Sequence, residues 1–132
     1  MLLNLTDLSS EPLQSQIVRQ VRGRILAGDL KAGTSLPSIR ALATEQRVSV
    51  ITVQRAYELL EREGLIHSRR GKGFFVSDLL DHEKKDMAKE RLEKSIEAHV
   101  QAALSAGLRP QDVKAVVELI LKQNGIRQGA SK

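Results

Sequence analysis

Cysteine and tryptophan are absent from this chain of 132 residues, and its only aromatic side chains are one tyrosine and two phenylalanines. Without cysteine there can be no disulfide framework, no thiolate zinc site and no thiol nucleophile. With so few aromatic residues, the core has to be built from leucine, isoleucine, valine and alanine. Such an aliphatic core is common in helical proteins.

Long apolar runs are also missing, since no stretch approaches the roughly 18 apolar residues that a membrane-spanning helix requires. The N-terminus, MLLNLTDLSS, lacks the basic start and the apolar core of a signal peptide. Apolar residues make up 41% and charged residues 28%, as in globular proteins and unlike disordered ones. We therefore expect a soluble cytoplasmic protein that does not bind a membrane.

No credible catalytic set is found. The carboxylates stand mostly beside lysine or arginine on predicted helix faces, and neither a phosphate-binding loop nor a dinucleotide fingerprint is present. His82, Glu83 and Asp86 have a spacing that could suit a metal, but a charged helix face produces such spacings by chance. We expect no enzyme activity, no cofactor and no metal site.

The net charge is +5, and the basic residues are spread over both halves of the chain. The one dense basic cluster is formed by Arg69, Arg70 and Lys72. A basic balance fits a polyanionic partner, although by itself it is weak evidence. Its position beside the motif described next makes it more informative.

Apolar periodicity predicts three helices before residue 65. The first covers residues 12–27, with Pro12 in its first turn and Ser10 or Glu11 as its cap. The second is short and begins after Ser38. After a brief link, Ser49 is expected to cap a longer helix, and Gly64 is expected to follow its end.

Two short apolar runs, 65–68 and 74–77, flank the glycine-containing turn 69–73 and predict a β-hairpin. Because successive strand residues alternate in direction, one of Phe74 and Phe75 should face outward. A short helix, a tight turn, a helix with a polar start and a basic hairpin together indicate a winged helix-turn-helix. The fold class is therefore mainly α with a small β-hairpin wing.

Two further amphipathic helices are predicted, one over residues 80–106 and one from Pro110 to a frayed end near Gly125. Two helices cannot enclose a core alone, so their apolar stripes must pack on the first domain or on a second copy of the chain. We favour a dimer contact. Its expected residues are Leu92, Ile96, Val100, Leu104, Val113, Val116, Val117, Ile120 and Leu121.

Residues 11–77 resemble the N-terminal winged helix-turn-helix of the GntR family of bacterial transcription regulators. The resemblance rests on EPLQSQIVRQVRGRILAGDLKAGTSLPSIRALA, VSVITVQRAYELLEREGLI and RRGKGFFV, which occur in the family's order and spacing. The C-terminal part resembles the short dimerisation appendage of the YtrA-type subfamily. The resemblance thus implies a DNA-binding domain over residues 1–78 and a helical dimerisation region over residues 79–132.

The resemblance also implies roles for three groups of residues. Ser38 and Arg40 belong to the LPSIRALA segment, whose arginine contacts the DNA backbone or a base edge. The recognition helix, which enters the major groove, begins with Ser49, Val50, Ile51, Thr52, Gln54 and Arg55. The wing tip, which relatives direct into the minor groove, is formed by Gly71, Lys72 and Gly73. From their charge alone, Arg69, Arg70 and Lys72 are expected to supply the part of the affinity that is independent of sequence.

One departure from the family concerns Val50 and Gln54, because many relatives have arginine at these positions. Base contacts made by those arginines cannot be carried over to this chain. From the residues themselves, Gln54 can pair with adenine and Arg55 with guanine. Arg55 has an alternative partner in Glu58 or Glu61 of its own helix.

These observations predict a homodimeric, sequence-specific repressor that binds a pseudo-palindromic DNA operator in the bacterial nucleoid. The subfamily resemblance suggests a neighbouring transporter operon as its target and leaves open a small-molecule effector. Two alternatives stay open. One is a protein-interaction module, to which the apolar Val50 and Ile51 point, and the other is an architectural DNA binder without sequence preference.

Overall fold

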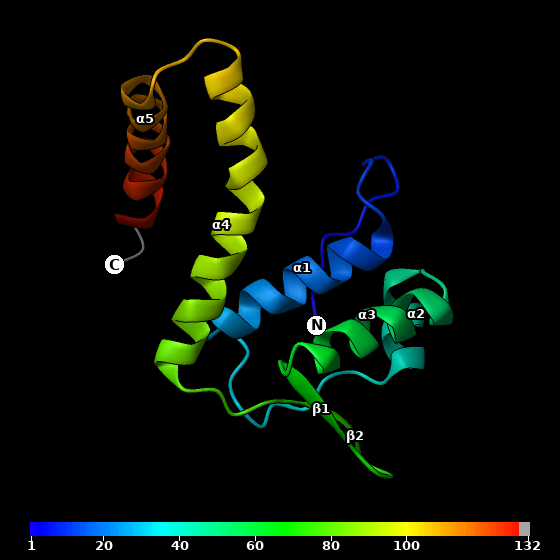
Figure 1. Cartoon of the computed structure of the whole chain (residues 1–132). Helices are drawn as coiled ribbons and strands as arrows, with labels where there is room; N and C mark the ends of the chain where they lie inside the picture. Colours follow the sequence, from blue (N-terminus) through cyan, green and yellow to red (C-terminus); the bar gives the residue numbers. More distant parts are fainter. Residues whose placement is uncertain (130–132) are drawn as a thin grey trace. The chain divides into compact units, whose positions relative to one another are not determined.

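Three helices and a two-stranded hairpin form the first half of the chain in the computed structural model, which describes residues 1–129 (Figure 1). The winged helix-turn-helix predicted from the sequence is confirmed. Its elements are α1 (Leu13–Leu26), α2 (Ile39–Gln46), α3 (Val50–Arg62), β1 (Ile66–Arg69) and β2 (Gly73–Val76). The chain divides into two compact units within its next helix, the first unit ending at Ala88 and the second beginning at Lys89.

The core of the first unit is aliphatic, as the composition required. Each helix contributes one face to it: α1 buries Ile17, Val21 and Ile25, α2 buries Leu42, and α3 buries Val53, Ala56 and Leu60. The single tyrosine, Tyr57, lies at the centre with no exposed surface. Its hydroxyl donates to the carbonyl of Pro37 at 2.8 Å, and its ring meets Phe74 edge to face at 5.0 Å between centroids.

The hairpin is antiparallel, and Ile66 pairs with Val76 at its base, next to the core. The segment preceding α2 adds to the outer edge of β2 through a bridge between Ser35 and Phe75. Hydrogen bonds from Leu36 N to Phe74 O and from Val76 N to Thr34 O, both 2.9 Å, extend this pairing. The wing is thereby fixed from both sides at its base.

The start of α1 differs from the prediction, because Pro12 itself is the N-cap residue and no side chain caps the helix. Neither Ser10 nor Glu11 serves as the cap. The Glu11 carboxylate instead accepts hydrogen bonds from Arg19, which lower its pKa. The Glu11 carbonyl accepts from the side chain of Gln16 at 2.8 Å.

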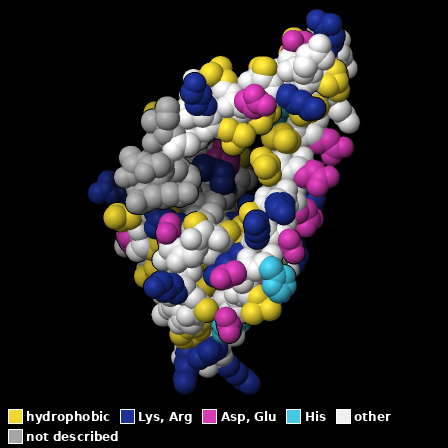
Figure 2. Space-filling model, turned by 90° about the vertical axis from the view of Figure 1, so that its left-hand side faces the viewer, with side chains coloured by type: hydrophobic (Ala, Val, Ile, Leu, Met, Phe, Trp, Pro, Cys, Tyr) yellow, Lys and Arg dark blue, Asp and Glu magenta, His cyan; other side chains and the backbone are white. Residues whose placement is uncertain are grey.

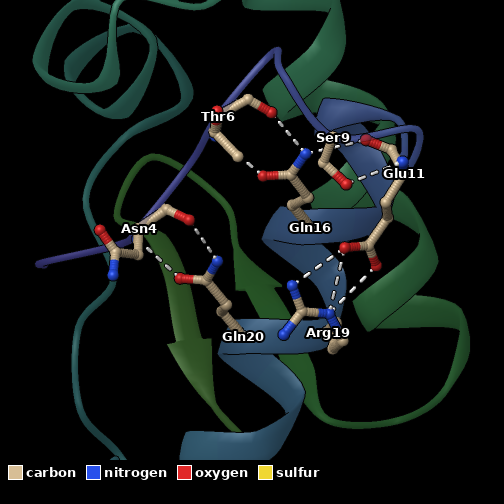
Figure 3. Close-up of polar contacts among 7 residues, drawn as sticks. All are labelled: Asn4, Thr6, Ser9, Glu11, Gln16, Arg19 and Gln20. Carbon is tan, nitrogen blue, oxygen red and sulfur yellow. Dashed lines mark hydrogen bonds and ion pairs between the residues drawn. The ribbon is translucent and has the colours of Figure 1, made fainter.

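The N-terminal segment runs along α1 and is held by two glutamines one helical turn apart (Figure 3). Gln16 accepts from the Thr6 amide at 2.9 Å and donates to the Thr6 carbonyl at 2.7 Å. Gln20 makes the same pair of contacts with Asn4, at 2.7 and 2.8 Å. Each side-chain amide thus imitates the backbone of a neighbouring strand.

The remaining helices are α4 (Asp81–Ser105) and α5 (Pro110–Gly129). Both were expected, but α5 does not fray at Gly125. A glycine inside a helix costs only about 1 kcal/mol, which the helix tolerates here. The predicted frayed tail otherwise lies partly outside the described residues. Within residues 1–129, no helix combines the length and the hydropathy that a membrane crossing needs.

Candidate nucleic-acid interface

The two helices of the helix-turn-helix begin with serine caps. The Ser38 hydroxyl accepts from the Ala41 amide, and the Ser49 hydroxyl accepts from the Thr52 amide, both at 3.0 Å. Between them, Arg47 adopts the left-handed conformation with φ of 57° and ends α2 in a tight turn. Both caps were predicted, and they hold the starts of α2 and α3 on the surface.

The first two turns of α3 present a mixed outward face. Val50 and Ile51 are 44% and 58% exposed, although both are aliphatic, and Gln54 and Arg55 are exposed one turn further on. Thr52 is half-buried because it faces back toward the cap, where its hydroxyl lies 2.8 Å from that of Ser49. The outward face therefore combines apolar, amide and cationic groups.

The carboxylates of α3 have other partners than the sequence suggested. Glu58 accepts from the Gln54 amide at 3.2 Å, and Glu61 accepts from both the amide and the hydroxyl of Ser68 at 3.0 Å. Arg55 forms an ion pair with neither of them. Arg55 is exposed on the outward face, while Glu61 ties the first strand of the wing to α3.

The tip of the wing depends on glycine for its backbone conformation. Gly71 and Gly73 have φ of 76° and 97°, which side-chain-bearing residues rarely adopt, whereas the space around both is open. The Lys72 amide donates to the Arg69 carbonyl at 2.9 Å and closes the turn. Arg70 and Lys72 are exposed there, and Figure 2 shows basic side chains gathered at the lower end of the view, where Figure 1 places the hairpin.

An aromatic support for the wing was not identified from the sequence. Phe74 packs against Tyr57, so Phe75 is the phenylalanine on the opposite face, where it stacks with its cross-strand partner His67 at 6.1 Å between centroids. The guanidinium carbon of Arg69 lies 4.7 Å from the centroid of the Phe75 ring. Alternation along β2 was the only sequence signal, and it could not say which ring faced outward.

The residues assigned to DNA thus come from three places: the start of α2, the start of α3 and the tip of the wing. All of them are exposed except the half-buried Thr52. Accessibility is what DNA contact requires, but the contacts themselves stay a prediction. The chemistry offered is hydrogen bonding and apolar contact from α3 and cationic groups from the wing.

The stripe assigned to dimerisation is accessible in the second unit. No residue of α4 is buried, and Leu92, Ile96 and Val100 line a shallow open groove on it. Among the exposed members of the stripe, the exposed fraction of the residue ranges from 41% for Ile96 to 63% for Leu121. Val100 and Val113 are half-buried, and the other exposed members of the stripe are Leu104, Val116, Val117 and Ile120.

Comparison with known proteins shows which family has this architecture. Residues 13–76 match the model of the gntR family of bacterial regulatory proteins. The HTH-type transcriptional repressor YtrA of Bacillus subtilis is 39% identical over 103 residues, which are 74% of this chain and 79% of that protein. The uncharacterised HTH-type transcriptional regulator YhcF of the same organism is 31% identical over 113 residues, 83% of this chain and 93% of that protein.

A solved GntR family transcriptional regulator from Listeria monocytogenes superposes with a TM-score of 0.73 and 28% identity, covering 86% of this chain and 97% of that one. These relatives are regulators rather than enzymes, in agreement with the expectation from the sequence. Family model, curated relatives and structure all match the same helix-turn-helix and wing. The chain belongs to the gntR family of bacterial regulatory proteins and is a DNA-binding transcriptional regulator.

Proposed function

We propose that the protein is a homodimeric repressor that binds a pseudo-palindromic operator and so blocks transcription from a nearby promoter. Residues 1–78 bind the DNA, and residues 79–132 join the two copies. The observation that carries the proposal is the exposed start of α3 with the basic wing tied to the same helix through Glu61. The similarity to YtrA of Bacillus subtilis, a transcriptional repressor by name, supports repression.

In this proposal α3 lies in the major groove and the wing follows the phosphate backbone into the minor groove. Base-specific contacts come from the outward face of α3, whereas the wing arginines and Lys72 supply the affinity that is independent of sequence and sensitive to salt. Ser38 and Arg40 hold the start of α2 against the sugar-phosphate backbone of the DNA. The free amide groups at the start of each helix favour the same phosphates.

Two considerations support dimerisation. A single helix-turn-helix reads too few base pairs for useful specificity, and two copies reach half-sites about one helical turn, roughly 34 Å, apart. Several large apolar residues on α4 and α5 are also exposed to water, and burying them against a second copy is favourable. The groove lined by Leu92, Ile96 and Val100 would receive side chains of that copy.

The proposed place of action is the nucleoid in the bacterial cytoplasm, and the proposed target is an operon for a transporter next to the regulator's gene. A small-molecule effector would act on the C-terminal helices. By changing the separation of the two α3 helices, it would change the affinity for both half-sites together.

The decisive experiment is selection of genomic DNA fragments by the purified protein at about physiological salt with competitor DNA present. The proposal expects enrichment of fragments that share a two-fold-symmetric site. Binding without enrichment would favour an architectural role. Failure to retain any fragment would overturn the DNA-binding proposal and favour docking of the winged helix on an acidic protein surface.

Substitutions separate the proposed contacts once a site is known. Gln54→Ala and Arg40→Ala should weaken binding to the enriched site, and Gln54→Ala should relax base preference. Lys72→Ala should weaken binding to every duplex alike and lower the slope of log Kd against log salt by about one. Lys31→Ala, which removes an exposed cation outside the proposed interface, is the control.

The dimer contact is tested by a charge placed in the stripe. Ile96→Glu should shift the protein toward monomer in analytical ultracentrifugation and weaken operator binding, because the new carboxylate would be buried on association. Leu119→Glu is the matched control, since Leu119 is 56% exposed on α5 but lies outside the stripe. If the Ile96→Glu variant remained a dimer, the proposed dimer contact through α4 would be contradicted.

A further inference from the structure

Two exposed aliphatic side chains stand where α3 would meet the bases. Val50 and Ile51 are the first residues of the helix, and 44% and 58% of their surface is in contact with water. Two residues after Ile51, Val53 has no exposed surface and belongs to the core, whereas Val50 and Ile51 are not among the buried core residues. Apolar groups that the fold leaves in water at a binding surface are candidates for an apolar contact with the ligand.

The major groove contains one apolar group, the C5 methyl of thymine. The other groups that distinguish the base pairs in that groove are hydrogen-bond donors and acceptors, which neither Val50 nor Ile51 can satisfy. An A·T base pair therefore fits these side chains, whereas a G·C pair would lose water from its polar groups without gaining a partner. Aliphatic side chains at the start of such a helix therefore suit thymine better than the other bases.

The neighbouring amide fits the same base pairs. Gln54 lies one helical turn after Val50 and Arg55 one turn after Ile51, so the four side chains share the outward face. Gln54 donates one N–H to Glu58 at 3.2 Å, which leaves its second N–H and its carbonyl oxygen free. Those two groups match N7 and the N6 amino group of adenine, and Glu58 orients the amide toward them.

We propose that α3 reads an A·T-containing half-site, with Val50 and Ile51 packed on thymine methyl groups and Gln54 paired with adenine. This inference rests on the proposed function, since it specifies which bases the operator contains. It also assigns positioning of the Gln54 amide to Glu58. The exposed apolar pair is thereby explained by DNA recognition and needs no protein partner.

The first stage of the test is selection from a random duplex library with the full-length protein. The bound half-site should contain thymine and adenine within its recognised positions. The selected duplex is then remade with deoxyuridine in place of each thymine in turn, which removes only the methyl group. Loss of a contacted methyl should weaken binding by about fourfold, as expected for one buried methyl-sized group.

The second stage pairs the base analogue with a protein variant. Val50→Ala and Ile51→Ala should each bind the thymine duplex more weakly and lose sensitivity to deoxyuridine at one position. Leu8→Ala, which shortens a side chain that is 94% exposed elsewhere, should keep full sensitivity. Gln54→Ala should lose about tenfold in affinity and become insensitive to 7-deazaadenine, which lacks the N7 acceptor.

The outcomes distinguish the inference from the proposed function. A selected site at which no deoxyuridine weakens binding overturns thymine recognition but leaves a sequence-specific DNA-binding protein. Equal sensitivity to deoxyuridine in the wild type and in both alanine variants overturns the assignment to Val50 and Ile51. A library from which no duplex is enriched overturns the inference and the proposed function together.

Discussion

Arg69 and Phe75 form a cation–π pair at the edge of the wing, with the guanidinium carbon 4.7 Å from the ring centroid. Phe75 is itself stacked on His67 of the opposite strand, so the arginine rests on a support that the hairpin register fixes. An arginine held in this way loses less side-chain entropy when it binds a phosphate. The pair therefore links the packing of the hairpin to the proposed DNA affinity.

Replacing Phe75 with leucine should weaken DNA binding without unfolding the wing. Exposed cation–π pairs are worth about 0.5–1 kcal/mol, which limits the pre-organising effect, so we expect a loss in affinity of at most roughly two- to fivefold. The loss should be equal for operator and scrambled duplexes, because a phosphate contact carries no sequence information. Fluorescence anisotropy with both duplexes measures it. Phe75→Tyr keeps an aromatic face and should bind like the wild type, and a tyrosine variant as weak as the leucine variant would exclude the cation–π explanation.

Tyr57 makes the stability of the first unit sensitive to alkaline pH. Burial, with a smaller contribution from Glu45, raises the pKa of its hydroxyl well above the ordinary value of 10.0. Below pH 10 the hydroxyl is protonated in both the folded and the unfolded state and adds no pH dependence. Above pH 10 only the unfolded state ionises, so the free energy of unfolding should fall by up to about 1.4 kcal/mol for each pH unit.

Urea unfolding between pH 7 and pH 11 tests this expectation, with Tyr57→Phe as the control. The variant lacks the hydrogen bond to Pro37 and should lose about 1 kcal/mol at pH 7, but it should decline less at high pH. Since Tyr57 is the only tyrosine, the absorbance of tyrosinate reports on this group alone. A hydroxyl that titrates near pH 10 in the folded protein would show that it is not buried.

The predictable part of this structure depends on contacts that are close in the sequence. Ser38 and Ser49 cap helices through amides three residues away, and Gly64 follows α3 with φ of 79°. Such contacts involve residues within about one helical turn of each other, so the local sequence contains both partners. The family resemblance adds the order of the elements. The caps, the helix-turn-helix and the hairpin could accordingly be located from the residues alone.

What could not be predicted depends on which of several chemically suitable partners is near in space. Glu58 or Glu61 was expected as an alternative partner of Arg55, yet Glu58 binds Gln54 and Glu61 binds Ser68 in the wing. The sequence alone does not show whether a carboxylate binds a side chain four residues away on its own helix or one in the strand that follows the helix. The choice is made by tertiary packing, and it decides which side chains of α3 are available to DNA.

Arg22 and Glu63 join α1 to the end of α3 through two charged hydrogen bonds of 2.9 and 2.8 Å. Their side chains are only 14% and 21% exposed, so water screens the pair weakly. Arg22→Met keeps an unbranched apolar side chain but removes the guanidinium from Glu63. We expect a loss of about 2 kcal/mol in the free energy of unfolding, measured by urea denaturation.

The matched control for that pair is Arg19→Met, which breaks the ion pair with Glu11 on the solvent side of the same helix. The exposed pair should contribute little, because solvent screening and side-chain entropy offset its attraction. Similar losses for the two variants would mean that burial of Arg22 does not strengthen its contact.

Gln16 and Gln20 allow the cost of burying an amide to be measured within one helix. Both hold the N-terminal segment with paired hydrogen bonds to a single residue, but Gln16 is 2% exposed, whereas the contacts of Gln20 are open to solvent. Gln16→Ala leaves the Thr6 amide, the Thr6 carbonyl and the Glu11 carbonyl without their partner at a partly buried position. We expect it to lower the free energy of unfolding by about 2–3 kcal/mol.

Gln20→Ala should cost less than 1 kcal/mol, since water can replace the lost contacts with Asn4. Hydrogen exchange at the Thr6 amide should accelerate in the Gln16 variant only, which would show that the N-terminal segment detaches before the core unfolds. Equal losses of stability in the two variants would instead mean that water enters at Gln16 as readily as at Gln20. The segment would then be a surface segment rather than part of the packed domain.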